Sequence, residues 1–339
     1  MFCVTFYSYK GGVGRTMALA NVAMEHARNG KKVLVVDFDL EAPGLSTLTP
    51  FAQSMGEPGI IDFVSEYCSS GVVPDVKNFI YNCPVEGDGF ESFNIDILPA
   101  GSGGDAYSEA YSSIEWASIY QENNGFLMME DLRAQWKDAG YDYVYLDSRT
   151  GHTDIGGICT RQLPDAVAIV FFPNAQNLEG LRQTVPEIRN HSARGYEIET
   201  LFVASRVPRL DDEDGVLKRL LANFQETLEY SPNNLVVIEQ YDSLKLLDQE
   251  LFVLTRPRSG MARQLRKLAY QISMLNVEDA DGAVAYLQKT LSALGRDDFV
   301  FDEVYSRPSN SIDFHKLSKI RDAHEHDSLI LFLLAQVYH

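Results

Sequence analysis

A glycine-rich loop near the start of the chain has the residue types of a phosphate-binding site. The loop runs Tyr9-Lys10-Gly11-Gly12-Val13-Gly14-Arg15-Thr16, directly after an apolar strand and before a helical stretch. Glycines let backbone N–H groups curl around phosphate oxygens, and the N-terminal end of the helix adds a positive potential. The threonine hydroxyl can bind Mg²⁺. We therefore expect contacts to a phosphorylated ligand from Gly11, Gly12, Val13, Gly14, Arg15, Thr16 and Met17.

This loop departs from the usual phosphate-binding pattern at two positions. Tyr9 replaces the first glycine, and Arg15 replaces the lysine that precedes the final Ser or Thr. Arginine keeps the positive charge but is bulkier and carries a planar fork, so it is not equivalent to lysine. The loop also has an early lysine, Lys10, which cannot easily fold back onto the ligand of its own chain. We therefore expect its charge to contact a ligand that is bound by a second subunit.

Two apolar runs farther along the chain end in carboxylates. The first, residues 33–36, leads into Asp37 and Asp39, which lie on the same side of a strand because side chains alternate. The second, residues 143–146, leads into Asp147, with a glycine four residues later. Both runs predict buried parallel strands, and the carboxyl ends of such strands form the edge where open α/β sheets bind ligands. Solvated turn acids are the alternative interpretation of the first pair.

In order and spacing, these three segments resemble the ParA/MinD family of P-loop ATPases, whose deviant motif is Lys-Gly-Gly-x-Gly-[Lys/Arg]-Thr. The resemblance covers roughly residues 1 to 275. It implies ATP and Mg²⁺ as cofactors, and a homodimer across shared ATP in which the early lysine reaches the partner's ATP. It also implies that Asp39 orients the attacking water, and that the metal shell includes Thr16, Asp37 and Asp147. The expected catalytic residues are Lys10, Arg15 and Asp39.

Four other residues are candidates for contacts with the ligand, and alternatives remain open for them. Relatives usually have Asn where this chain has Ser205, followed here by Arg206. Serine reaches less far and makes fewer hydrogen bonds, so the identity of the base stays open although ATP is expected. Tyr241 falls where relatives place a base-lining loop, and it either stacks on the base or packs in the core. Arg149 stands where relatives have a proline-rich segment; it contacts phosphate or pairs with an acid such as Asp154.

An alternating series of strands and helices predicts an α/β fold, a mostly parallel twisted sheet with helices on both faces. A helix is expected over residues 17–29, and strands are expected at residues 94–98, 166–173, 201–205 and 235–238. We predict an ATPase domain over residues 1–275, with a variable, insertion-rich region at 50–140. A short helical C-terminal extension is predicted over residues 276–339.

The composition and net charge of the chain restrict the classes of partner that it is expected to bind. The chain has 339 residues, of which 45% are apolar, and a formal net charge of −19. Its four cysteines are scattered, which disfavours a disulfide framework or a metal site. No apolar stretch is long enough to span a bilayer, and acids before the apolar segment 329–334 disfavour an anionic membrane, so we expect a cytoplasmic protein. The negative charge also disfavours DNA, although basic residues gather at Arg256, Arg258, Arg263, Arg266 and Lys267.

The expected function is a dimerising, Mg-ATP-dependent switch that controls a partner protein. We expect ATP hydrolysis to be slow because arginine replaces the usual lysine, and phosphoryl transfer depends on the position of that cation. The motifs also look similar to those of poorly characterised bacterial ParA-like ATPases, some of which accompany defence or effector modules. The alternatives are an ATP-sensing adaptor or scaffold subunit with little hydrolysis, and a DNA-associated partition ATPase. A steady-state ATPase rate separates the switch from the adaptor.

Overall fold

The computed structural model describes residues 1–87, 89–151, 154–190, 193, 195, 197–209, 215–241, 250–294 and 312–338. The chain divides into two compact units, Met1–Lys267 and Leu268–His339. This division falls within helix α10 (Gly260–Leu275). The sequence predicts a domain boundary after residue 275, which stays a prediction.

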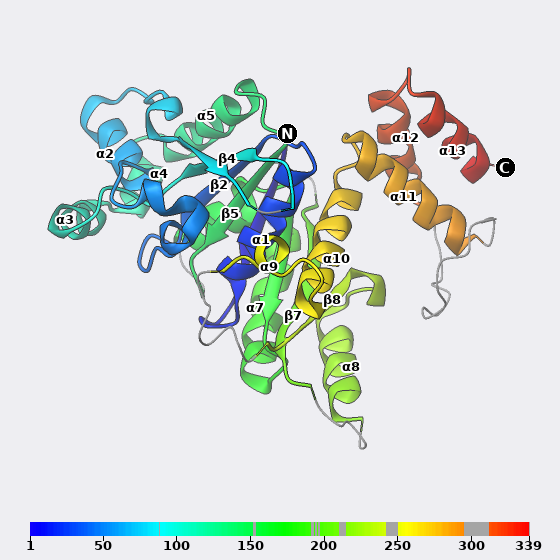
Figure 1. Cartoon of the computed structure of the whole chain (residues 1–339). Coiled ribbons are helices and arrows are strands. Elements are labelled where there is room, and N and C mark those ends of the chain that lie inside the picture. The colour runs from blue at the N-terminus through cyan, green and yellow to red at the C-terminus, as the bar shows by residue number, and fades with distance from the viewer. Residues whose placement is uncertain are drawn as a thin grey trace. The chain divides into compact units, whose positions relative to one another are not determined.

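An eight-stranded sheet forms the centre of the first unit, in the order β3-β4-β2-β5-β1-β6-β7-β8 (Figure 1). Neighbouring strands are parallel except for the antiparallel pair of β3 and β4. Helices pack on both faces of the sheet, so the predicted α/β fold is confirmed. The strands are β1 (Phe2–Tyr7), β2 (Val33–Phe38), β3 (Tyr81–Val85), β4 (Phe93–Leu98), β5 (Tyr143–Ser148), β6 (Ala166–Phe171), β7 (Glu199–Val207) and β8 (Leu235–Glu239).

Buried apolar runs account for the inner strands. Every residue of β2, β5 and β6 is buried, as expected for strands of a parallel sheet that is covered on both faces. In the register of the sheet, Asp37 on β2 and Phe6 on β1 both lie opposite Asp147 on β5. The two aspartates are therefore neighbours at the carboxyl edge of the sheet, where the sequence predicts the ligand.

The helices of the first unit bury their apolar faces against different parts of the sheet. Helix α1 (Arg15–Arg28) contacts β1, β2, β4 and β5. One core cluster joins β2 and β5 to α2 (Ile60–Ser70), α4 (Trp116–Glu122) and α5 (Gly125–Asp138). A second cluster joins β6 and β7 to α7 (Ala175–Asn190) and α8 (Val216–Leu228). Further helical segments are α3 (Asp105–Ser113), α6 (Asp154–Gly157), the π-helical turn η4 (Ile158–Gln162) and α9 (Phe252–Thr255).

The region from residue 50 to residue 140 contains helices α2 to α5 and the antiparallel pair of β3 and β4. Strand β3 lies at the edge of the sheet and contains Pro84. Proline has no N–H to donate to a neighbouring strand, and an edge strand tolerates this because it has a neighbour on one side only. Helix α2 begins directly against the end of β4, since a Cβ on Gly59 would lie 2.0 Å from the carbonyl oxygen of Pro99. Short 3₁₀ turns lie at Leu45–Thr47, Thr49–Ser54, Val76–Phe79 and Pro232–Asn234.

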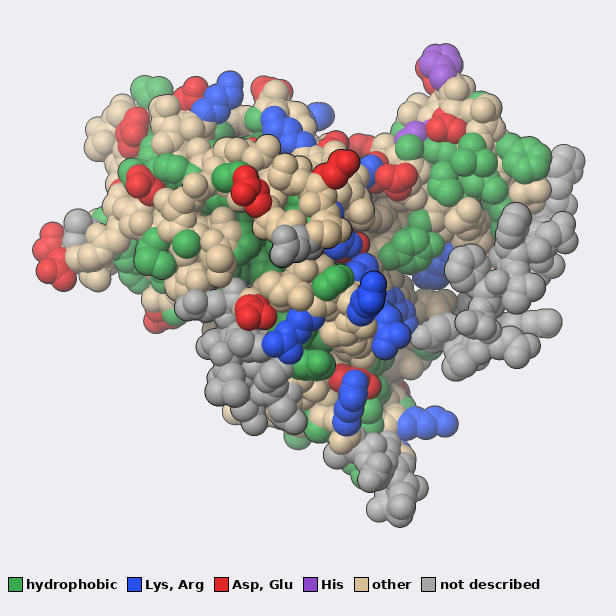
Figure 2. All heavy atoms as spheres, viewed as in Figure 1, with side chains coloured by type: hydrophobic (Ala, Val, Ile, Leu, Met, Phe, Trp, Pro, Cys, Tyr) green, Lys and Arg blue, Asp and Glu red, His purple; other side chains and the backbone are tan. Residues whose placement is uncertain are grey.

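The second unit is helical. After the end of α10 it contains α11 (Ala280–Ala293), α12 (Phe314–Ala323) and α13 (Ser328–Tyr338). One core cluster joins these helices, and Leu287, Leu317 and Ile330 are fully buried in it. The surface of the unit carries apolar side chains that are more than half exposed (Figure 2): Phe314, Leu329, Phe332 and Tyr338. Within the described ranges of the chain, no helix is long and apolar enough to cross a membrane.

Candidate functional site

The glycine-rich loop connects β1 to α1 at the carboxyl edge of the sheet. Gly12 and Gly14 have φ angles of +74° and +84°, in the left-handed region that favours glycine. The backbone of the loop also approaches the end of β7, because a Cβ on Gly14 would lie 3.4 Å from the Ser205 hydroxyl oxygen. The loop therefore needs glycine for its backbone conformation, as the sequence predicts for a loop that curls around phosphate.

Arg15 lies at the centre of a buried charged cluster. Its Nε donates to Asp147 Oδ1 at 2.5 Å, and its Nη2 donates to Asp39 Oδ2 at 2.7 Å. The Thr16 hydroxyl donates to the other Asp147 oxygen at 2.6 Å. Burial alone would lower the pKa of Arg15, but the carboxylates of Asp147 and Asp39 raise it above its ordinary value. The structure thus brings together four residues that the sequence assigns to phosphate, water and metal.

Asp37 lies close to this cluster, but its carboxylate is bonded to the backbone. Its oxygens accept hydrogen bonds from the N–H groups of Asp39 at 3.2 Å, Gly44 at 3.2 Å and Leu45 at 3.1 Å. Burial and the neighbouring Asp147 carboxylate raise the pKa of Asp37 to about 8. Asp37 therefore fixes the turn after β2 and, through it, the position of Asp39. Its place in a metal shell stays a prediction.

Tyr9 and Lys10 form the start of the loop. The Lys10 Nζ lies 5.3 Å from the centroid of the Tyr9 ring, within the range of a cation–π interaction. The ring itself packs on α7, where a Cβ on Gly180 would lie 2.2 Å from a ring carbon. A glycine on α7 thus accommodates the tyrosine that replaces the usual first glycine of the loop. The reach of Lys10 toward a second subunit stays a prediction.

Arg149 contacts two residues that the sequence does not predict as its partners. It forms an ion pair with Glu41, from the turn after β2, and its Nη1 donates to the Tyr111 hydroxyl at 3.3 Å. Tyr107, one turn earlier on α3, donates to the carbonyl of the residue before Glu41 at 2.7 Å. Within the described part of the chain, the acid that pairs with Arg149 is therefore Glu41. The side chain of the expected partner, Asp154, lies outside the described part of the structure.

A hollow of about 300 Å³ opens beside the loop, between α1, the ends of β7 and β8, and the first turns of α10. Arg206 at its edge has a φ of +57°, and its guanidinium donates to the carbonyl of Gly12. The Tyr241 ring packs edge-on against Phe252, with ring centroids 5.2 Å apart. The size of the hollow suits a small ligand. Its lining includes Met17, Ser205, Arg206, Tyr241 and the apolar side chains of Ile238, Met261 and Leu265.

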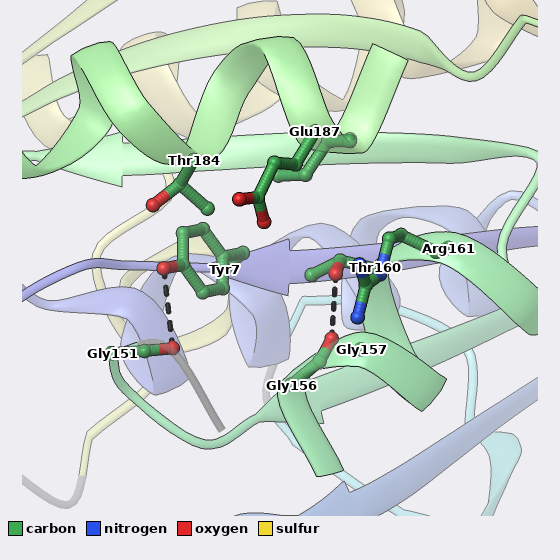
Figure 3. A pocket seen from close by; sticks show the side chains of 9 residues that line it. Tyr7, Gly151, Gly156, Gly157, Thr160, Arg161, Thr184 and Glu187 are labelled. Carbon is green, nitrogen blue, oxygen red and sulfur yellow. Dashed lines mark hydrogen bonds between the residues drawn. The ribbon is translucent and has the colours of Figure 1, made fainter. Parts of the chain in front are cut away.

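A second, smaller hollow lies beside the segment that follows β5, with Arg161 and Glu187 directed toward it (Figure 3). Tyr7, the last residue of β1, donates its hydroxyl to the carbonyl of Gly151 at 3.2 Å. Burial raises the pKa of Tyr7 to about 12, so the hydroxyl keeps its proton at neutral pH. This hydrogen bond ties the segment after Asp147 to the base of the glycine-rich loop.

The donor set of the charged cluster suits Mg²⁺ together with phosphate. Mg²⁺ prefers oxygen ligands and is usually bound by one or two carboxylates plus substrate phosphates. Asp147 and Thr16 supply such oxygens, and Arg15 Nη1 is buried without a hydrogen-bond partner among the described residues. Within that part of the chain, no group of three or more His, Cys, Asp or Glu side chains is arranged to hold a metal ion by itself. A metal at this cluster would therefore share its shell with the ligand.

The chain is similar to known proteins both in sequence and in structure. The model of a family described as an AAA domain matches residues 1–198. The chain is 24% identical over 209 residues to the septum site-determining protein MinD of Helicobacter pylori, which covers 60% of this chain and 66% of that protein. Its structure is similar to the cell division ATPase MinD of Pyrococcus furiosus, with a TM-score of 0.58 and 18% identity over 81% of this chain and 99% of that chain. MinD of Pyrococcus horikoshii, solved with Mg-ADP, has a TM-score of 0.56 and 18% identity over 81% and 97%.

The fold is that of the ParA/MinD-type P-loop proteins, and together with the family model it confirms the resemblance inferred from the sequence. The chain belongs to the AAA-domain family whose model matches residues 1–198. It spans 37% of the length of an uncharacterised ATP-binding protein of Methanocaldococcus jannaschii and 66% of the length of Helicobacter pylori MinD. The likeness to the solved structures establishes the fold.

Proposed function

We propose that this protein is a Mg-ATP-dependent molecular switch that dimerises across two shared ATP molecules and controls a partner protein. The convergence of Arg15, Thr16, Asp39 and Asp147 at the end of the P-loop carries this proposal. These groups supply a cation for phosphate, oxygen ligands for a metal and a carboxylate for a water molecule. The family of the chain and the archaeal MinD solved with Mg-ADP support ATP and Mg²⁺ as the cofactors.

Each residue has its own task in the proposed reaction. Backbone N–H groups of the loop, with the amino end of α1, bind the phosphate oxygens, and Arg15 adds a guanidinium. Thr16 and Asp147 are the groups that would hold Mg²⁺, which neutralises phosphate charge when it is bound with the nucleotide. Asp39 orients the attacking water. We expect slow turnover, because positioning dominates phosphoryl transfer and Arg15 stands where the usual pattern has lysine.

The hollow beside the loop receives the nucleoside in this proposal. Met17 and the other apolar side chains provide a surface for the base, and Tyr241 stands at the same wall. Arg206 reaches from the end of β7 to the P-loop carbonyl of Gly12, so it lies between the base side and the phosphate side of the site. Ser205 offers one hydroxyl for recognition of the base, which is fewer polar atoms than an Asn side chain offers.

Substitution of Lys10 tests the dimer. Lys10→Ala should abolish dimerisation with Mg-ATP, because no cation would then reach the triphosphate of the other subunit. Light scattering with and without Mg-ATP measures the mass, and circular dichroism checks that the monomer stays folded. Lys137→Ala, which removes an exposed lysine from α5, is the matched control and should dimerise like the wild type. A Lys10→Ala protein that still dimerises with ATP would show that the trans role is wrong.

Substitution of Asp39 tests hydrolysis. Asp39→Ala should trap the ATP-bound dimer, because the water loses the carboxylate that orients it. The steady-state release of phosphate should fall by about 10² or more, the scale of a lost general base. An unchanged turnover number would remove Asp39 from the water-activating role.

The ion pair between Arg15 and Asp39 favours a second function. At 2.7 Å from Arg15 Nη2, the Asp39 carboxylate is bonded to a cation of its own chain. If this pair persists with ATP bound, the protein is an ATP-sensing adaptor or scaffold subunit with little hydrolysis. Dimerisation by ATP without measurable turnover would identify the adaptor.

A pull-down in the ATP state would identify the partner. The resemblance to ParA-like ATPases that accompany defence or effector modules suggests a protein from such a bacterial module. A DNA-associated partition function is the less favoured alternative, because the net charge of −19 opposes the electrostatic attraction on which non-specific DNA binding depends. Retention of DNA at physiological salt would favour partition instead.

A further inference from the structure

Arg15 bonds to the carboxylates that would otherwise be available to a metal ion. Its Nε bonds to Asp147 Oδ1, and the Thr16 hydroxyl bonds to Asp147 Oδ2. Its Nη2 bonds to Asp39 Oδ2. Both oxygens of Asp147 are therefore engaged by donors of the protein itself. A metal ion that binds Asp147 must displace or rearrange at least one of these bonds.

The charges explain why the guanidinium lies there. Asp147 is fully buried, and the side chain of Asp39 is only 15% exposed. Buried carboxylates are costly unless a counter-charge and hydrogen bonds satisfy them. The planar fork of Arg15 bonds to two carboxylates at once through different nitrogens, whereas a lysine ammonium is a single point charge. Arg15 is 6% exposed, so water screens these ion pairs weakly.

We propose that Arg15 is an internal counter-ion that keeps Mg²⁺ out of the site until a nucleotide binds. The inference rests on the proposed function, because it concerns how that nucleotide site acquires its metal. Arg15 Nη1, buried without a partner in the described part of the chain, is the group that phosphate attracts first. As the guanidinium turns toward phosphate, Asp147 and Thr16 are released for the metal. Each ligand then raises the affinity for the other by the same factor, as thermodynamic linkage requires.

Mn²⁺ in place of Mg²⁺ tests the proposal on the full chain, because paramagnetic resonance measures the free ion directly. Without nucleotide, Arg15→Gln should bind Mn²⁺ at least about tenfold more tightly than the wild type, because its carboxylates have lost their counter-charge. Arg15→Lys keeps the charge but lacks the fork that bonds to both carboxylates, so its Mn²⁺ affinity should lie between those of the wild type and Arg15→Gln. Asp147→Asn added to Arg15→Gln should remove the new site, which locates the ion.

Arg15→Gln leaves two acids without a counter-charge and can fail to fold, so a second background is needed. Asp39→Asn removes one of these acids and keeps Asp147 and Thr16. The double variant Asp39→Asn/Arg15→Gln should bind Mn²⁺ more tightly than the Asp39→Asn single variant. Equal Mn²⁺ affinity with and without Arg15, in a background that folds, would overturn the proposal.

A non-hydrolysable ATP analogue separates this inference from the proposed function. The wild type should bind the analogue and gain at least about tenfold in Mn²⁺ affinity, and the protein without Arg15 should gain less. Failure of the wild type to bind the analogue would contradict the proposed function. Binding with an equal gain in both proteins would leave the proposed function standing and overturn the role of Arg15.

Discussion

At the scale of single residues, Asp37 makes folding depend on pH. Burial and the Asp147 carboxylate raise the pKa of Asp37 from 3.8 to about 8 in the folded protein. Between these two values the folded protein keeps a proton that the unfolded chain has lost. The unfolded state then binds fewer protons, so the contribution of Asp37 to the free energy of unfolding falls as pH rises through this range.

Asp37→Asn should remove this contribution. The free energy of unfolding of the variant, relative to the wild type, should therefore increase as pH rises from about 5 to about 8, because asparagine does not titrate. Urea unfolding at several pH values measures it. Asp138→Asn, which changes an exposed acid on α5, is the matched control. A difference between Asp37→Asn and the wild type that stays constant with pH would show that Asp37 is already ionised in the folded protein.

At the scale of elements, the position of the glycine-rich loop depends on α7. Tyr9, directly before Lys10, packs where α7 has Gly180, and a Cβ there would lie 2.2 Å from the ring. The start of the loop is therefore set by a helix that begins more than a hundred residues later in the chain. A change on α7 should move Lys10, and with it the cation that we propose for the second subunit.

Gly180→Ala should therefore destabilise the protein although alanine favours helices. The helix gains about 1 kcal/mol from the loss of glycine, but overpacking against Tyr9 costs about 1–3 kcal/mol. We expect a net loss in the free energy of unfolding, measured with urea, together with weaker ATP-dependent dimerisation. Gln183→Ala on the exposed face of the same helix is the control and should be nearly neutral. A more stable Gly180→Ala protein would show that the ring does not pack there.

Hydrogen bonds and an ion pair also join the elements around the site. Arg149 after β5 contacts Glu41 after β2 and Tyr111 on α3. Tyr7 at the end of β1 holds the carbonyl of Gly151. The segment after Asp147 is thus bonded to both neighbouring strand ends and to a helix of the variable region. A movement of this segment would reach α3, which gives the variable region a physical connection to the site.

At the scale of the whole molecule, the chain has two compact units, each with its own core clusters. Leu287 on α11 is fully buried in the second unit, where it packs with α12 and α13. The residues of the proposed nucleotide site lie in the first unit. We therefore propose that the two units unfold separately.

Leu287→Ala should destabilise the second unit by about 2–5 kcal/mol, because a buried leucine leaves a cavity. Hydrogen exchange resolved by peptide should become faster in α11 and α13 and stay unchanged in β1, β2 and β5. Leu132→Ala in the core of the first unit is the matched control and should show the opposite pattern. Faster exchange in both units with either variant would show that they unfold as one.

The sequence by itself determined the fold class, the glycine-rich loop between strand and helix, and the two strands that deliver Asp37, Asp39 and Asp147. These features follow from local signals: glycines at left-handed backbone positions, apolar runs of strand length, and carboxylates where those runs end. The register of β2 and β5 places Asp37 beside Asp147. Both lie at the carboxyl edge of the sheet, where open α/β sheets bind their ligands.

Only the tertiary structure decided what these residues bond to. Arg15 and Asp147 are 132 residues apart in the chain, and their ion pair exists because β1 and β5 are neighbours in the sheet. The contacts of Arg149 with Glu41 and Tyr111 also join distant segments of the chain. So does the packing of the Tyr9 ring against Gly180. Strand order and side-chain packing create such contacts, and neither leaves a periodic or compositional signal in the sequence.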